Sequence, residues 1–155
     1  MPCNTAHYFL DDIQKAVRVP LLNMIALTAR ACSERKLTRV CVLATEGTVY
    51  ANLYQHALSR YGISCRYPEN TYQKIAENVI FHGVKADEGV SYDDLSALVM
   101  HAVERACDGI ILGCTELSCA FAGYRYSGTD SPPAIIDALT VLADEIISIA
   151  GVRHK

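Results

Sequence analysis

The sequence predicts an α/β fold with a parallel sheet flanked by helices, and three observations predict it. RVCVLAT (39–45) and DGIILGC (108–114) are continuous apolar runs, which are typical of strands buried on both faces. Helical patterns separate the candidate strands, and parallel neighbours need such crossovers. Small polar residues follow both runs, as they do at the carboxyl edge of a parallel sheet, where α/β proteins place their ligands.

The first elements can be assigned in chain order. VPLLNMIAL (19–27) predicts a strand that runs into a helix, and the helical pattern continues to Lys36. The strand at 39–45 follows. EGTV (46–49) then turns the chain into a helix over 50–62, which ends on Gly62 as expected for a C-terminal glycine.

The remaining elements repeat the alternation. ISCRYP (63–68) predicts a short strand, and 70–85 a helix with Asn70 and Thr71 as cap candidates. A third helix over 91–106 has Ser91 at its N-cap and acidic residues in its first turn. After the strand at 108–114, residues 134–151 predict a short strand that feeds an amphipathic helix. The one obvious loop, rich in Gly, Ser and Pro, covers residues 123–133.

Composition excludes several classes of protein. The 155 residues suffice for one full core or for two small lobes that share a cleft. Hydrophobic residues make up 51% and charged residues 20%, which excludes a disordered chain. The net charge of -3 lacks the excess of positive charge that is typical of proteins that bind nucleic acid. Neither a membrane-length apolar run nor a secretory signal pattern is present. We therefore expect a cytoplasmic protein with no nucleic-acid or membrane partner.

Seven cysteines raise the question of disulfides or metal. Their number is odd and no C-x-x-C pair occurs, so neither framework is indicated. Cys41 and Cys65 lie in strand patterns, and Cys32 and Cys107 in or beside helical ones, so we interpret these four as structural.

Cys3 and Cys114 occur in matching contexts. Each precedes polar residues and a helical pattern, and Cys114 ends a strand. A helix N-terminus offers free N–H groups and a positive dipole end, which predicts a lowered thiol pKa at Cys114. For one such cysteine, an inert residue is the better interpretation. Two cysteines in the same context favour a catalytic role for both.

Three motifs carry a resemblance to a known family. PCNTAH (2–7), LATEGTVYANLYQ (43–55) and LGCTEL (112–117), in that order, resemble the aspartate/glutamate racemase family of cofactor-independent amino-acid racemases. IIDALTVLADEI (135–146) resembles the closing strand and helix of that family. The resemblance implies two similar α/β lobes with the active site between them, an amino-acid substrate, no cofactor, no metal and a homodimer.

The resemblance also implies a division of the chain. Residues 39–131 resemble a second lobe, 1–38 a remnant of the first lobe, and 132–155 a strand and C-terminal helix that return to the first lobe. In a complete family member, further strands and helices precede PCNTAH. We therefore expect the chain to lack the N-terminal part of the first lobe, and its activity to be reduced or lost for that reason.

Inversion at an α-carbon requires removal of a proton from one face and delivery of a proton to the other. By resemblance, Cys3 and Cys114 are the two bases. The developing carbanion needs donors around its carboxylate. By resemblance, Asn4, Thr5 and Thr115 hold the amino and carboxylate groups of the substrate. Thr45, Gly47 and Thr48 lie on the turn after the strand at 39–45, from which backbone and hydroxyl groups can donate to a carboxylate. Ordinary helix capping is an equal alternative for these threonines.

Three charged or titratable residues, Lys85, Glu116 and His7, have competing interpretations. Lys85 matches a family lysine that pairs with the side-chain carboxylate of an acidic substrate, and a solvated helix end is the alternative. Glu116 orients a thiol or the substrate ammonium, or is simply a first-turn acid. His7 either polarises Cys3 or, the favoured interpretation, has a capping or packing role. Asp137 caps the last helix.

The sequence therefore predicts an enzyme that racemises aspartate or glutamate by two-cysteine proton transfer. An inactive racemase-like fragment, or a module that binds a partner, is one alternative. A hydantoin racemase or a maleate isomerase is another. Arylmalonate decarboxylases resemble this pattern with only one of the two cysteines. A tautomerase that uses Pro2 would begin with a β-strand, for which CNTAH is poorly suited.

Overall fold

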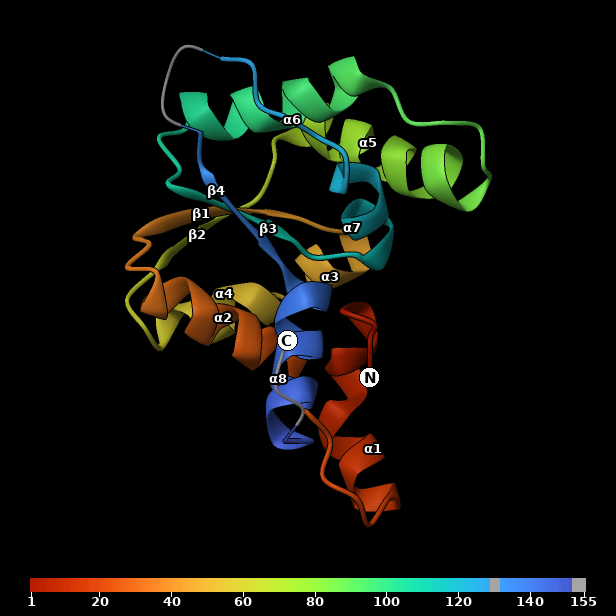
Figure 1. The fold of residues 1–155 in the computed structure, drawn as a ribbon, viewed down its shortest axis with the longest axis vertical. Coiled ribbons are helices and arrows are strands. Elements are labelled where there is room, and N and C mark those ends of the chain that lie inside the picture. The colour runs from red at the N-terminus through yellow and green to blue at the C-terminus, as the bar shows by residue number, and fades with distance from the viewer. Residues whose placement is uncertain (129–131, 152–155) are drawn as a thin grey trace.

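The computed structural model describes residues 1–128 and 132–151. A four-stranded sheet in the order β2-β1-β3-β4 forms its centre, and all three strand pairings are parallel. This arrangement confirms the predicted α/β fold with a parallel sheet flanked by helices (Figure 1). The strands are β1 (Arg39–Leu43), β2 (Ser64–Arg66), β3 (Gly109–Leu112) and β4 (Ala134–Asp137).

Helices cover both faces of the sheet (Figure 1). Side chains alternate along β1, so that Cys41 and Leu43 pack under α5, α6 and α7, whereas Val40 and Val42 pack under α2 and α4. This alternation explains why the strand is apolar throughout. The helical elements are η1 (Thr5–Phe9), α1 (Leu10–Ala16), α2 (Met24–Glu34), α3 (Glu46–Tyr50), α4 (Leu53–Ser59), α5 (Asn70–Asn78), η2 (Val79–Lys85), α6 (Tyr92–Glu104), α7 (Thr115–Phe121) and α8 (Ala138–Ile149).

The strand register brings two predicted motifs to one edge of the sheet. Leu43 lies opposite Leu112, and the N–H of Gly113 donates to the carbonyl of Leu43 over 2.7 Å. The residues that follow, Thr45 after β1 and Cys114 after β3, therefore leave the sheet at the same carboxyl edge.

The strand predicted at the start of 19–27 is wrong. Pro20 lacks an N–H, and the N–H of Leu21 donates to the Gln14 side chain at 2.8 Å rather than to a neighbouring strand. The chain stays irregular until Asn23, whose side chain accepts from the N–H of Ala26 and caps α2.

Two predicted helices differ in their boundaries. The helix predicted over 50–62 begins earlier, at Glu46, and is broken at Asn52, which has a left-handed φ of 52°. The helix predicted over 70–85 begins as an α-helix, and its last seven residues, η2, form a π-helix. Ser91 caps α6 as predicted, since its side chain accepts from the N–H of Asp94.

The C-terminal elements lie against this same sheet. β4 pairs with β3, and α8 packs on α2. The division of the chain into a remnant of a first lobe (1–38), a second lobe (39–131) and a returning strand and helix (132–155) stays a prediction. The predicted loop at 123–133 is irregular from Tyr124 to Gly128, and 129–131 lie outside the described residues.

Within the described parts of the chain, no helix is both long and apolar enough to span a bilayer.

Candidate active site

Three threonine hydroxyls meet at the carboxyl edge of the sheet. Oγ1 of Thr5 lies 2.8 Å from Oγ1 of Thr48 and 3.1 Å from Oγ1 of Thr45, although more than thirty residues separate Thr5 from both. Gly47 permits this approach, because a Cβ there would lie 3.2 Å from Cγ2 of Thr5. The structure therefore brings together four of the residues predicted to bind substrate.

The threonine cluster extends from the interior to the surface. Thr48 is fully buried, Thr45 is partly buried and Thr5 is exposed. Thr45 occupies the N-cap position of α3, yet its side chain makes no capping hydrogen bond and faces the other two hydroxyls instead. Helix capping therefore does not explain the orientation of the Thr45 side chain. Hydroxyls both donate and accept, so this cluster is chemically suited to a carboxylate.

A second cluster surrounds the thiol of Cys114, at the N-cap of α7. Sγ of Cys114 donates to Oε2 of Glu116 over 2.8 Å, and Oγ1 of Thr115 donates to the same oxygen over 3.0 Å. Nζ of Lys85, at the end of η2, lies 3.6 Å from Oε1 of Glu116 and 4.7 Å from the centre of the Phe81 ring. All four predicted residues of this cluster thus lie together.

Burial and the Glu116 carboxylate oppose ionisation of the Cys114 thiol. Burial, followed by the hydrogen bond to Glu116, raises the pKa of Cys114 to about 12. Burial also tends to raise the pKa of Glu116. Hydrogen bonds from Cys114, from its own N–H and from Thr115, together with the charge of Lys85, nevertheless hold that pKa below its usual value. The predicted lowering of the Cys114 pKa by the helix N-terminus is wrong, because burial and an adjacent carboxylate outweigh it.

The Cys3 segment is held by His7. Cys3 is exposed, and its carbonyl accepts from Nδ1 of His7 over 2.7 Å. Nε2 of His7 accepts from the N–H of Met24, at the start of α2, over 3.0 Å. Both ring nitrogens are therefore occupied by backbone groups, and burial lowers the pKa of the imidazole. This geometry supports the capping or packing role for His7 rather than polarisation of the Cys3 thiol.

Asn4 turns its side chain inward. It is buried, and its Oδ1 accepts from the hydroxyl of Tyr54 over 2.6 Å. Tyr54 is fully buried in α4 and was not among the residues predicted to be functional. The sequence signal that could have identified Tyr54 was its place inside the motif LATEGTVYANLYQ. A buried phenol needs a polar partner, so a tyrosine there suggests a hydrogen bond to a neighbouring polar residue. Asn4 therefore has at least one structural contact beside its predicted contact with substrate.

Asp137 has the capping role that was predicted for it. Its carboxylate accepts from the N–H of Leu139 over 3.0 Å and from the hydroxyl of Thr140 over 2.7 Å, at the start of α8. Ser118 of α7 also donates to it over 2.6 Å. Asp137 thereby joins α8 to α7, the helix whose N-cap is Cys114.

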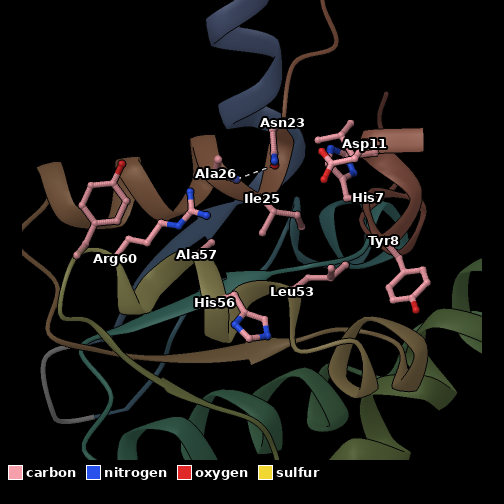
Figure 2. A pocket seen from close by; sticks show the side chains of 12 residues that line it. His7, Tyr8, Asp11, Asn23, Ile25, Ala26, Leu53, His56, Ala57 and Arg60 are labelled. Carbon is pink, nitrogen blue, oxygen red and sulfur yellow. Dashed lines mark hydrogen bonds between the residues drawn. The ribbon is translucent and has the colours of Figure 1, made fainter. Parts of the chain in front are cut away.

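A separate hollow of about 390 Å³ lies between the N-terminal segment, the start of α2 and α4. Figure 2 shows His7 and Asp11 on one side of it and His56 and Arg60 on the other. None of the predicted catalytic or substrate-binding residues lines this hollow. The chemistry at the sheet edge, rather than this hollow, therefore defines the candidate site.

Comparison with known proteins places this site in context. The family model described as Asp/Glu/Hydantoin racemase matches residues 1–146. The broad specificity amino-acid racemase RacX of Bacillus subtilis (strain 168) is 26% identical over 149 residues, which cover 96% of this chain and 62% of RacX. A protein from the pnlA 3′ region of Pectobacterium carotovorum subsp. carotovorum is 31% identical over 109 residues, 70% of this chain and 73% of that protein.

Solved structures share the fold. The Picrophilus torridus aspartate racemase superimposes with a TM-score of 0.74 at 28% identity, and covers 100% of this chain and 62% of that one. An aspartate racemase homologue from Pyrococcus horikoshii OT3 has a TM-score of 0.77 at 24% identity, and covers 96% of this chain and 64% of that one. The chain thus spans less than two thirds of the length of both structures and of RacX.

Proposed function

Because the chain belongs to the Asp/Glu/Hydantoin racemase family, whose model matches residues 1–146, we propose that it racemises aspartate or glutamate without a cofactor. One observation supports this proposal most strongly. The thiol of Cys114 lies in a cluster with Thr115, Glu116 and Lys85, at the sheet edge where Thr5 brings the Cys3 segment against Thr45 and Thr48. The two predicted bases therefore belong to segments that both lie at one edge of the sheet.

The proposed reaction moves one proton in each half-step. The Cys3 thiolate removes the α-proton from one face of the amino acid and becomes a thiol. The Cys114 thiol delivers its proton to the opposite face of the carbanion and becomes a thiolate. In the reverse direction the two roles exchange. The atoms and charges balance with no further reactant.

The threonine cluster supplies the donors that such a carbanion requires. The α-proton of an amino acid is very weakly acidic, so negative charge on the α-carboxylate must be stabilised as it develops. Hydroxyl hydrogens of Thr5, Thr45 and Thr48 are proposed to bind this carboxylate. Because the three Oγ1 atoms lie within hydrogen-bond distance of one another, the hydroxyls are already brought together before substrate binds.

Lys85 is the proposed partner of the substrate's side-chain carboxylate. Its ammonium carries three donors, and its side chain is 46% exposed beside Glu116. One donor can remain with Glu116 while the others bind a carboxylate. This arrangement favours an acidic amino acid over an uncharged one. A homodimer and a cytoplasmic location remain predictions from the sequence.

Exchange of the α-proton with solvent tests the proposal directly. The purified 155-residue chain is incubated in D₂O with each enantiomer of aspartate, glutamate and alanine, and deuterium at Cα is measured by NMR. We expect incorporation into aspartate or glutamate to be slow, in keeping with the reduced activity predicted from the sequence, but still faster than incorporation into alanine. Incorporation no faster than in a protein-free blank would contradict the proposal and favour an inactive fragment or an interaction module. A 5-substituted hydantoin, followed by its enantiomeric composition, and maleate, followed by its conversion to fumarate, test the related activities of the family.

A further inference from the structure

Glu116 is held as a carboxylate by the groups around it. Its Oε2 accepts hydrogen bonds from Cys114 and from Thr115, and its Oε1 faces the ammonium of Lys85. The side chain is only 20% exposed, so these partners, more than water, determine its charge. Together they favour the ionised form.

The contact between Glu116 and Cys114 requires a proton on sulfur. An ionised carboxylate only accepts hydrogen bonds, so the 2.8 Å contact needs an S–H donor. A thiolate at that distance would place two negative charges side by side in a partly buried site. Lys85 offers one charge from η2, but it lies beside the other carboxylate oxygen. Asp137 of β4 reaches this region only through Ser118, whose hydroxyl lies 3.5 Å from the carbonyl of Cys114.

The surroundings of Cys3 differ. Its side chain is exposed, whereas Cys114 is partly buried. His7, the titratable side chain that contacts the Cys3 backbone, is neutral, because Nε2 must accept from the N–H of Met24 while Nδ1 carries the single proton. Among the described residues, no carboxylate hydrogen bond to the Cys3 thiol is found.

We propose that Glu116 is a positioning residue that sets the resting protonation state of the site, in which it holds Cys114 as a neutral thiol and leaves Cys3 as the base. This inference rests on the proposed function for its catalytic meaning. In the resting protein Cys114 is then the proton donor. The enantiomer whose α-proton faces Cys3 reacts from this state. The other enantiomer reacts only after the proton of Cys114 has been lost and Cys3 has gained one.

The test follows alkylation of each thiol by iodoacetamide as a function of pH, with peptide mass spectrometry to resolve the cysteines. Cys119, exposed on the same helix α7, is an internal reference. In the unmodified chain we expect the midpoint of Cys114 alkylation to lie well above that of Cys119. In Glu116→Gln we expect this midpoint to fall, with alkylation of Cys114 at pH 8 at least about tenfold faster. Glu116→Asp, which keeps the carboxylate, should retain a high midpoint.

Burial also raises the pKa of Cys114, so exposure alone would lower the alkylation midpoint. Glu116→Asp is therefore the control, because it shortens the side chain but keeps the charge, and an equal fall of the midpoint in both variants would point to exposure and overturn the inference. An unmoved midpoint in Glu116→Gln, or a Cys114 midpoint equal to that of Cys119 in the unmodified chain, would overturn the inference. These measurements need no turnover. A chain that shows no α-proton exchange would therefore count against the proposed function, and the alkylation profile would still decide the role of Glu116.

Discussion

The hydroxyl of Tyr54 donates a 2.6 Å hydrogen bond to Oδ1 of Asn4, the residue next to Cys3. The ring of the same tyrosine packs against Gly113, the residue next to Cys114. A Cβ on that glycine would lie 3.2 Å from Cε2 of the ring and 3.0 Å from the carbonyl oxygen of Leu43. One buried side chain therefore contacts the neighbours of both proposed bases.

Removal of the Tyr54 hydroxyl should destabilise the fold. In Tyr54→Phe, Oδ1 of Asn4 loses its partner in a buried setting, which costs about 1–3 kcal/mol of unfolding free energy. Urea unfolding followed by circular dichroism measures this loss. Tyr50→Phe is the matched control, since Tyr50 is 90% exposed, and it should change stability by less than about 0.5 kcal/mol. Equal stabilities of the two variants would show that the hydrogen bond does not hold Asn4.

Replacement of Lys85 by Met should weaken binding of acidic substrates selectively. A charge-assisted hydrogen bond contributes about 1.5–3 kcal/mol, so KM for aspartate should rise by about tenfold to a hundredfold. The exchange assay, run over a range of substrate concentrations, gives KM. Lys74→Met removes an exposed lysine of α5 and should leave KM unchanged. An equal loss on aspartate and on an uncharged amino acid would place Lys85 outside the side-chain pocket.

His7 should make stability depend on pH. Burial lowers the pKa of His7 in the folded chain, so below the ordinary histidine value of about 6.5 the unfolded chain binds protons more readily than the native one. The stabilising contribution of neutral His7 is therefore complete above that pH and is lost as pH falls through the lower native pKa. His101 is shifted in the same direction, also mainly by burial, and adds to the effect.

A variant isolates the contribution of His7. Unfolding free energies of the unmodified chain and of His7→Gln are compared at pH 7.5 and pH 5.5. We expect the unmodified chain to lose more stability between the two values than the variant loses. Equal losses would mean that protonation of His7 is not coupled to folding.

Much of the site could be predicted because its residues follow strands. Continuous apolar runs predict β1 and β3 from the sequence. The register of Leu43 with Leu112 then brings Thr45 and Cys114 to the carboxyl edge of the sheet. The selection of Lys85 depended on family resemblance and that of Glu116 on its place after Cys114 and Thr115, whereas local pattern alone favours a solvated lysine and a first-turn acid. The proximity of Lys85 to this cluster came only from the structure.

What could not be predicted depends on tertiary contacts. The apolar run around Pro20 has the composition of a strand, but it does not pair with a strand of the described sheet. The N–H of Leu21 donates to the Gln14 side chain instead. The pKa of Cys114 depends on the burial of its side chain and on the orientation of the Glu116 carboxylate, and neither can be predicted from the sequence. The contact between Tyr54 and Asn4 spans fifty positions, and no periodicity reports such a pair.

The central claim, two cysteines that act on opposite faces, is tested most directly by deuterium exchange from each enantiomer. The unmodified chain, Cys3→Ser, Cys114→Ser and Cys119→Ser are incubated in D₂O with L- or D-aspartate, and both Cα deuterium and enantiomeric composition are followed. We expect the unmodified chain and Cys119→Ser to exchange both enantiomers. Cys3→Ser and Cys114→Ser should each fail to interconvert them, and each should retain slow exchange from one enantiomer only, opposite in the two variants. Interconversion by Cys3→Ser or Cys114→Ser at a rate near that of the unmodified chain would contradict the two-base account.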